Sequence, residues 1–167
     1  MNEVKWRRLK SSVSDNDILL LEEKMNMTFP KDYKECVKVN QGTRPKPYIF
    51  DVEGVEKVFG ALLKINSPED PSDMWNNYLD YKTTLPKEVI PFALDPAGNL
   101  IYFDYKNHKE DPIIVFWGHE DAWEKEMLMR EEGLSEEEAE EAARENIFHV
   151  ADTFTDLLQK LHEDEED

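Results

Sequence analysis

The sequence is poor in cysteine, in cationic residues and in long apolar runs, and each shortage excludes a class of protein. It contains one cysteine, Cys36, so no disulfide can form within the chain, which agrees with a reducing compartment. No run approaches the ~18 apolar residues that a membrane-spanning helix needs. The N-terminal stretch MNEVKWRRLK is not followed by the apolar segment of a secretory signal. We therefore expect a cytoplasmic protein with no membrane partner.

The shortage of positive charge excludes further partners. The chain has 20 Lys and Arg against 38 Asp and Glu, which gives a formal net charge of −18. Phosphates and anionic lipids need cationic neutralisation, so the sequence predicts no nucleic-acid partner. A negative field attracts cationic proteins and speeds their approach, and it also serves solubility alone. The charge balance therefore favours a basic protein partner without naming one.

The pattern of apolar residues predicts the fold class. The chain has 167 residues, 40% of them hydrophobic, which suits one domain with its own core. Ser14 or Asp15 can cap a first helix, and Pro30 can open a second. Residues 43–65 and 85–117 carry the short apolar runs and turn residues typical of strands. Strands between terminal helices predict an α+β domain, with a mainly antiparallel sheet packed against N- and C-terminal helices.

The last third of the sequence has the composition of helices. Gly133 interrupts it, and Ser135 with Glu138 has the spacing of a capping box that starts a new helix. An apolar stripe over residues 146–161 predicts a closing helix that docks on the core. Residues 162–167, HEDEED, carry like charges, and we expect them to form a disordered tail.

The stretch DPAGNLIYFDY, residues 95–105, is a turn followed by a strand of bulky apolar residues. Asp95, Asn99 and Asp104 offer oxygen ligands, but the closely alternating acids and final Glu of a calcium loop are missing. The stretch therefore predicts a hairpin in which Asp95 accepts hydrogen bonds from turn amides. Gly98 or Asn99 is expected to supply the positive φ of the turn.

Other groups that carry chemistry are dispersed along the sequence. The four histidines are scattered and lack the spacing of a zinc helix, so we expect no metal site and no cofactor. Cys36 shares an apolar helical stripe with Tyr33 and Val37, where a thiol is usually buried and inert. The sequence contains no Gly-rich phosphate loop, serine elbow or dinucleotide fingerprint. We therefore predict no catalytic residue.

The acidic block EEGLSEEEAEEAARE is the most distinctive chemistry of the chain. It is interpreted either as a solvated helix face or as a mimic of phosphate spacing that docks onto the cationic site of a nuclease. On the second interpretation, the partner-binding residues are Glu136, Glu137, Glu140 and Glu141. Nearby apolar residues either anchor such an interface or pack on the domain: Met127, Leu128, Met129 and Leu134. A second candidate face consists of Asp73, Trp75, Tyr78, Asp95 and Glu120.

The order of the motifs resembles the SMI1/KNR4 family, also called the SUKH superfamily. The segments that carry the resemblance are FPKDYKECVKVNQG, LPKEVIPFALDPAGNLIYFDY, PIIVFWGHE and IFHVADTFTDLLQKL. The resemblance runs from about Ile18 to Leu161, and Thr153 stands where the family usually has Ser. Relative to a compact member, residues 121–145 look like an acidic helical insertion within a single domain of residues 1–161.

The resemblance implies an α+β fold without enzymatic activity. Many bacterial members of the family are immunity proteins that bind and neutralise a toxin, often a nuclease, whereas fungal members regulate cell-wall synthesis. We therefore expect a non-catalytic immunity protein that occludes a basic cognate toxin. The alternative is a regulatory scaffold that binds a housekeeping protein. An enzyme acting on a cationic small molecule is a third hypothesis, and it would require a deep pocket with converging polar groups.

Overall fold

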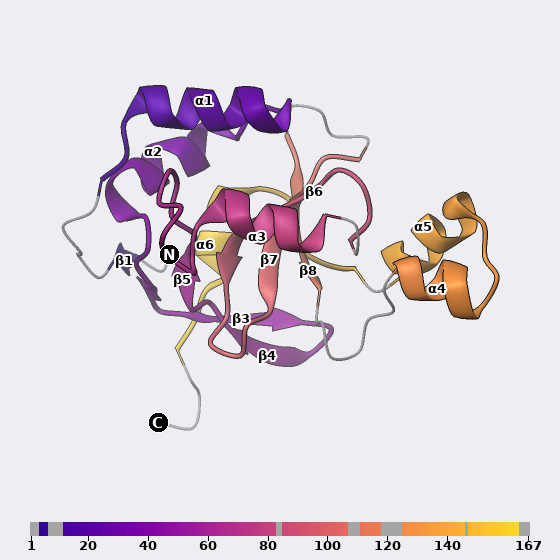
Figure 1. The fold of residues 1–167 in the computed structure, drawn as a ribbon. Helices are drawn as coiled ribbons and strands as arrows, with labels where there is room; N and C mark the ends of the chain where they lie inside the picture. Colours follow the sequence, from indigo (N-terminus) through magenta and orange to yellow (C-terminus); the bar gives the residue numbers. More distant parts are fainter. Residues whose placement is uncertain are drawn as a thin grey trace.

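The computed structural model describes residues 4–6, 12–82, 85–106, 111–117, 125–145 and 147–163 (Figure 1). The helices are α1 (Asp15–Met25), α2 (Lys31–Asn40), α3 (Met74–Tyr81), α4 (Lys125–Glu131), α5 (Glu136–Arg144) and α6 (Phe154–Lys160). The first strands are β1 (Lys5–Trp6), β2 (Pro45–Lys46), β3 (Ile49–Val52), β4 (Val55–Val58) and β5 (Ala61–Leu62). The later strands are β6 (Val89–Leu94), β7 (Leu100–Asp104), β8 (Ile113–Trp117) and β9 (Phe148–Ala151).

A five-stranded sheet in the order β5-β6-β7-β8-β9 forms the centre of the molecule. Every neighbouring pair in this sheet is antiparallel. Two shorter antiparallel pairs, β1 with β2 and β3 with β4, lie beside it. The predicted α+β class with a mainly antiparallel sheet is therefore confirmed.

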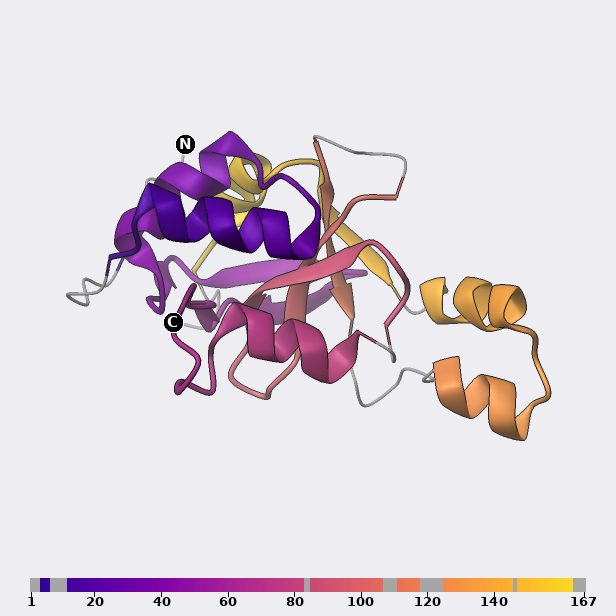
Figure 2. The same cartoon turned by 45° about the horizontal axis from the view of Figure 1, so that its top comes forward.

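Helices cover both faces of the sheet, and aromatic side chains fill the space between the layers. Tyr33 of α2 and Phe154 of α6 lie edge-on against Phe92 of β6, at 5.8 and 5.9 Å between ring centroids. On the other face, Tyr81 of α3 contacts Trp117 of β8 at 6.3 Å. Figure 2 shows the sheet between α2 and α6 above and α3 below. The core therefore lies on both faces of the sheet and is rich in aromatic side chains.

The two N-terminal helices follow their sequence signals closely. The Ser14 hydroxyl caps α1 by accepting from the Asp17 amide at 3.1 Å, as predicted. The C-cap of α1 is Asn26, whose φ of 54° is left-handed and ends the helix. The helix therefore stops ahead of Pro30, which disfavours a helical conformation in the residue before it. Pro30 lies at the N-cap of α2 rather than at its first residue. Within α2, Tyr33 is fully buried as expected.

The hairpin predicted from DPAGNLIYFDY is the β6–β7 connection. The Asp95 Oδ1 atom accepts from the amides of Ala97 at 2.9 Å and Asn99 at 2.8 Å. Gly98 has φ +92°, and a Cβ there would have no atom within 4 Å, so only the backbone conformation demands glycine. The structural interpretation of this stretch is confirmed, because its carboxylate serves the turn.

The predicted closing helix over residues 146–161 is wrong in its first half. Residues 148–151 form β9, whose backbone pairs with β8 in the register Val115 opposite His149. The helix α6 starts only after Thr153, whose Oγ1 accepts from the Asp156 amide at 2.9 Å. The apolar residues Phe148 and Val150 suit an edge strand as well as a helix, and pairing with the exposed edge of β8 decides between them.

The predicted disordered tail also begins too early. His162 forms an antiparallel bridge with Ile49 of β3, in which the His162 amide donates to the Ile49 carbonyl at 2.9 Å. The Ile49 amide donates in return to the His162 carbonyl at 3.1 Å. The chain is therefore fastened to β3 beyond Leu161, and residues 164–167 lie outside the described part.

The Tyr33 hydroxyl supplies a stability prediction. This hydroxyl is buried among aromatic rings, and no hydrogen-bond partner for it exists among the described residues. Burial also raises the Tyr33 pKa well above its ordinary value. An unpaired buried hydroxyl costs free energy, so Tyr33→Phe is expected to stabilise the fold by up to about 1 kcal/mol in urea denaturation.

The matched control is Tyr105→Phe, because the Tyr105 hydroxyl donates to the Thr28 carbonyl at 2.8 Å. That substitution removes a formed hydrogen bond and is expected to cost about 1 kcal/mol. If both substitutions destabilise the protein equally, the Tyr33 hydroxyl has a partner after all.

Candidate functional site

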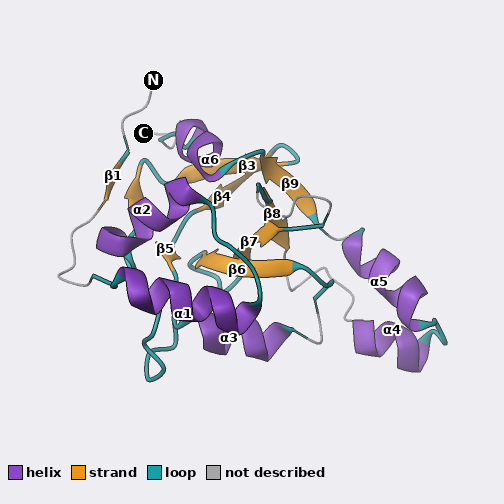
Figure 3. Cartoon of the chain, turned by 90° about the horizontal axis from the view of Figure 1, so that it is seen from above, coloured by secondary structure: helices purple, strands orange, loops and turns teal. Residues whose placement is uncertain are grey.

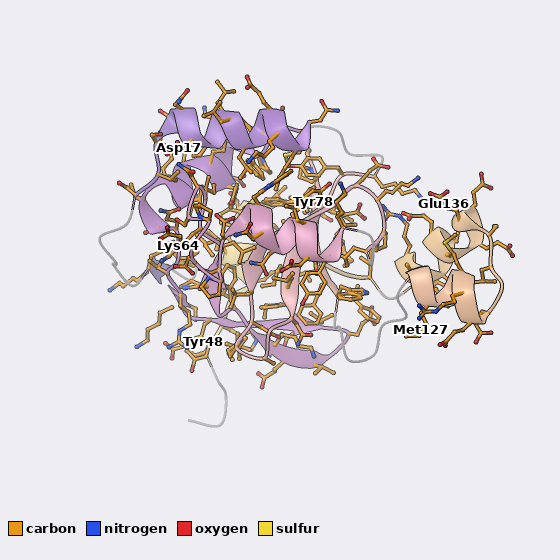
Figure 4. The ribbon with its side chains drawn as sticks, in the orientation of Figure 1. Asp17, Tyr48, Lys64, Tyr78, Met127 and Glu136 are labelled. Atoms are coloured by element: carbon orange, nitrogen blue, oxygen red, sulfur yellow. The ribbon has the colours of Figure 1, made fainter. Side chains whose placement is uncertain are left out.

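The acidic block supplies the turn and the second helix of a helical hairpin that projects from the body of the molecule. Helices α4 and α5 pack against each other and stand to one side of the sheet and its covering helices (Figures 1 and 4). Gly133 takes φ +69° between them, where no atom lies within 4 Å of an added Cβ. The break predicted at this glycine is confirmed, and it folds α4 and α5 back on each other.

A capping box starts α5, as the sequence predicts. The Ser135 Oγ atom accepts from the Glu138 amide, and the Glu138 carboxylate accepts from the Ser135 amide, both at 3.1 Å. These bonds hold the pKa of Glu138 below its ordinary value. The first turn of α5 also carries Glu136 and Glu137, whose negative charges suit the positive end of a helix.

Arg144 anchors the hairpin to the body. Its Nη1 lies 3.0 Å from Asp104 Oδ2 of β7, and its Nη2 lies 3.4 Å from Oδ1, so the pairing is a fork. The same Nη2 donates to the Lys87 carbonyl at 2.7 Å. The Arg144 side chain is 15% exposed and that of Asp104 is 9% exposed, so this ion pair is largely buried. A buried pair of this kind fixes the orientation of α5 on the sheet.

Glu140 belongs to the anchor rather than to the exposed face. Its Oε1 accepts from the Lys87 amide at 2.7 Å and lies 3.6 Å from Arg144 Nε. Its side chain is 20% exposed. This predicted partner-binding residue is therefore occupied in holding the hairpin.

The other predicted glutamates, Glu136, Glu137 and Glu141, are exposed. Glu137, Glu141 and Glu145 recur every fourth residue, so they form one ridge along α5, opposite the buried Ala139 and Ala143. Sequence reasoning left Glu145 out of the predicted site, although its spacing from Glu141 was visible. We call Glu137, Glu141 and Glu145 the acidic ridge.

Glu136 stands beside the ridge with a surface ion pair. Lys87 Nζ lies 3.5 Å from its Oε1, and both side chains are about 70% exposed (68% and 71%). An exposed pair contributes little to stability, so Glu136 stays available to a partner.

Apolar residues of the hairpin divide between packing and exposure. Leu128 is 7% exposed and Met129 is 42% exposed. Met127 and Leu134 are partly exposed. The sequence left open whether these four residues anchor an interface or pack inward, and the structure assigns Leu128 to packing and leaves Met129 at the surface.

The family assignment follows from the whole chain rather than from the hairpin. The sequence model of the SMI1 / KNR4 family (SUKH-1) matches residues 12–160. The chain belongs to this family. The match runs from the start of α1 through α6, so the acidic hairpin lies within the family domain. No curated protein matches the sequence. No helix in the described part of this SMI1/KNR4 protein is long and apolar enough to cross a bilayer.

Two carboxylates of the second candidate face serve the SMI1/KNR4 fold itself. Asp73, 3% exposed, caps α3 by accepting from the Asn76 amide at 3.0 Å and from the Ser67 amide at 2.8 Å. Asp95, 6% exposed, holds the β6–β7 turn. Both oxygens of each carboxylate are thus engaged in turns and caps. Glu120 lies outside the described residues.

Trp75 and Tyr78 remain at the surface of this SMI1/KNR4 domain as a partly exposed pair on α3. Their rings stack with centroids 5.6 Å apart, and Lys24 Nζ of α1 lies 4.7 Å from the Trp75 ring centre. Figure 3 shows α1 and α3 side by side, and Figure 4 places Tyr78 on the body, apart from Glu136 on the hairpin. The two candidate faces are therefore separate surfaces.

A groove of about 360 Å³ lies between α1 and α3. It is lined in part by Asp17, Leu20, Leu21, Lys24, Ile65 and Trp75. Leu19 and Leu20 of α1 are 51% and 53% exposed. The lining mixes these apolar side chains with the polar Asp17, Lys24, Asn66 and Asp73, and the Asp73 carboxylate is already engaged in capping α3.

The Cys36 thiol lies in an environment that makes it a poor nucleophile. Burial raises its pKa to about 11, despite a hydrogen bond from Asn40 Nδ2 at 3.6 Å. The thiol is therefore protonated at neutral pH, and the nucleophilic thiolate is scarce. Its surroundings are those of a packing residue, although it is partly exposed rather than fully buried.

The fold brings together one group of potential metal ligands that no sequence motif indicates. We expected no metal site because the histidines are scattered, but the fold places His162 beside Asp51 and Glu56 of the β3–β4 hairpin. Their nearest ligand atoms all lie within 4.8 Å of one another. Since 111 residues separate His162 from Asp51, no spacing motif signals this group.

Proposed function

We propose that this SMI1/KNR4 protein is a non-catalytic immunity protein. It binds a basic protein toxin, such as a nuclease, in the cytoplasm of the cell that makes the toxin. Binding blocks the toxin by occlusion of its cationic active site. Three observations support the proposal: the family membership, the formal net charge of −18, and the exposed acidic ridge on the α4–α5 hairpin.

The acidic ridge is the observation that carries the proposal. Like charges four residues apart destabilise a helix by about 0.2–0.5 kcal/mol per pair. The ridge contains two such pairs in succession, on a helix that a largely buried ion pair fixes to the sheet. Solubility alone requires neither the alignment of the glutamates nor the anchor. A fixed row of carboxylates is instead suited to a fixed row of cationic side chains.

The proposed mechanism uses the ridge in two steps. The negative field first steers the basic toxin, which raises the association rate at low ionic strength. The carboxylates then occupy the places where the toxin would bind phosphates, while Met129, 42% exposed, contributes apolar contact. No protein group reacts in either step, so the toxin is inactivated for as long as it stays bound.

The test is charge reversal on the ridge. Glu137→Lys with Glu141→Lys should lower the association rate by roughly 10–100-fold at low salt, because close charge pairs across the interface become repulsive. The partner used is the product of the reading frame adjacent to the gene. Surface plasmon resonance at two salt concentrations gives the rate, and growth rescue on co-expression gives the biological outcome.

The matched control reverses Glu35 and Glu69, which are exposed on the body. Both double variants change the net charge equally, so a difference between them isolates the ridge from the overall field. If the two variants lose the same amount of binding and rescue, the ridge is not the binding site. If the unaltered protein neither binds the adjacent product nor rescues growth, the immunity function itself is refuted.

A further inference from the structure

The β3–β4 hairpin and the C-terminal segment bring three metal-ligand side chains to one place. Asp51 and Glu56 are directly opposite each other in the antiparallel register of β3 and β4. His162 bridges to Ile49, two residues before Asp51 on the same face of β3. The imidazole is therefore diagonal to Asp51, and its Nε2 lies 3.1 Å from Asp51 Oδ2. Figure 1 shows β3 and β4 along the lower edge of the body, away from the α4–α5 hairpin.

A hydrogen bond on Nδ1 orients the His162 ring so that Nε2 faces the carboxylates. Its Nδ1 lies 2.9 Å from the Glu163 carbonyl oxygen. A carbonyl oxygen only accepts, so Nδ1 carries the hydrogen and donates it. Its Nε2 faces Asp51 Oδ2 at 3.1 Å, and a carboxylate also only accepts, so Nε2 carries a hydrogen as well when no ion is bound. A bound cation would replace that hydrogen and take the Nε2 lone pair, while Nδ1 keeps its bond to the carbonyl. Metal-bound histidines have this arrangement, with the second ring nitrogen donating to a carbonyl or carboxylate.

The spacing of the ligand atoms fits a transition metal. Ligands at 2.0–2.2 Å from a tetrahedral zinc ion lie about 3.3–3.6 Å from each other. The 3.1 Å between Asp51 and His162 is close to this value. Glu56 is exposed, so rotation of its side chain can bring its oxygen into range from within the 4.8 Å limit of the group.

The ligand types select the class of cation. An imidazole with two carboxylates suits zinc and neighbouring divalent transition metals, whereas magnesium and calcium prefer oxygen ligands throughout. Asp51 and Glu56 also repel each other across the two strands, and a bound cation would remove that repulsion.

We propose that Asp51, Glu56 and His162 bind a divalent transition metal of the zinc class, with water completing its coordination. The bound ion joins the C-terminal segment to the β3–β4 hairpin. Because the ligands come from chain segments far apart in sequence, binding requires the folded state and stabilises it. The site is separate from the acidic ridge and does not depend on the proposed toxin binding.

The test uses the full-length protein after chelator treatment and dialysis. Isothermal titration with zinc chloride should show one saturable site, and zinc should raise the melting temperature, whereas magnesium chloride should do neither. His162→Gln and Glu56→Gln should each weaken zinc binding by about tenfold or more and reduce the thermal shift, as loss of a ligand predicts. Glu56 is exposed, so its substitution tests the site even if His162→Gln loosens the C-terminal segment.

The matched control is His149→Gln. His149 also lies beside a carboxylate, with its Nε2 2.9 Å from Asp152 Oδ1, and is 50% exposed. This variant should bind zinc as the unaltered protein does. In nitrogen NMR spectra of the imidazoles, zinc should shift Nε2 of His162 and leave His149 unchanged. Absence of saturable zinc binding, or zinc binding that survives both His162→Gln and Glu56→Gln, would overturn the proposal.

Discussion

Phe103→Ala is expected to destabilise the protein by about 4 kcal/mol, the largest loss among the single substitutions considered. Phe103 lies in the central strand β7 and is fully buried. Its ring stacks on Phe92 at 4.2 Å and meets Tyr33 edge-on at 5.0 Å. Removing it opens a cavity whose walls come from the sheet and α2, which cannot easily collapse together. For a chain of this size the melting temperature should fall by about 8–16 °C.

The control for Phe103 is Phe148 on the edge strand β9, where the ring is 37% exposed. Phe148→Ala should cost less than about 1 kcal/mol, since little buried area is lost. If Phe103→Ala fails to fold, Phe103→Leu still measures the site, with an expected loss of about 1–1.5 kcal/mol from the change in shape. Equal losses for Phe103→Ala and Phe148→Ala in urea denaturation would contradict the packing described here.

Features governed by neighbouring residues were predictable from the sequence. The capping box of Ser135 and Glu138, the break at Gly133 and the β6–β7 turn each depend on contacts within a few residues. The polarity of such short segments and the steric demands of glycine act locally, so they leave a readable pattern. The order of these signals also gave the α+β class and the resemblance to the SMI1/KNR4 family.

Features decided by distant partners were not predictable. Residues 148–151 have an apolar pattern that fits a helix or a strand, and the free edge of β8 selects the strand. Glu140 looked like its exposed neighbours until Lys87, 53 residues away in sequence, proved to donate its amide to it. His162 likewise reaches Asp51 only through its bridge to Ile49. In each case the deciding contact joins elements that a single sequence does not pair.

The candidate site also combines features that the sequence predicts with features that depend on distant contacts. The sequence singled out the acidic block of α5 from its charge, and three of the four chosen glutamates are exposed. It gave no sign that Arg144, on the same helix, turns inward to β7. Charge density therefore indicates where an acidic surface lies, while the geometry that makes this surface rigid depends on one cation and its buried partner.

Arg144→Ala is expected to cost about 3 kcal/mol of stability, near the lower end for breaking a buried ion pair, because both side chains keep slight exposure. The loss arises mainly from leaving the Asp104 carboxylate buried without its cation and the Lys87 carbonyl without its donor. The melting temperature should fall by about 6–12 °C. Amide exchange in α5 should rise more than in β7, since the hairpin loses its anchor while the sheet keeps its ladder.

A double-mutant cycle separates the ion pair from general damage. Asp104→Asn alone should also destabilise the protein, and Arg144→Ala combined with Asp104→Asn should lose less than the sum of the two, by about 1.5 kcal/mol or more. Arg144→Lys should fall between, because a lysine keeps the charge but not the fork. Additive losses, or a loss below about 1 kcal/mol for Arg144→Ala, would show that the pair does not hold the hairpin. If the hairpin does depend on Arg144, the alanine variant should also weaken binding of the proposed toxin although every ridge glutamate is intact, because a mobile row of charges loses its alignment.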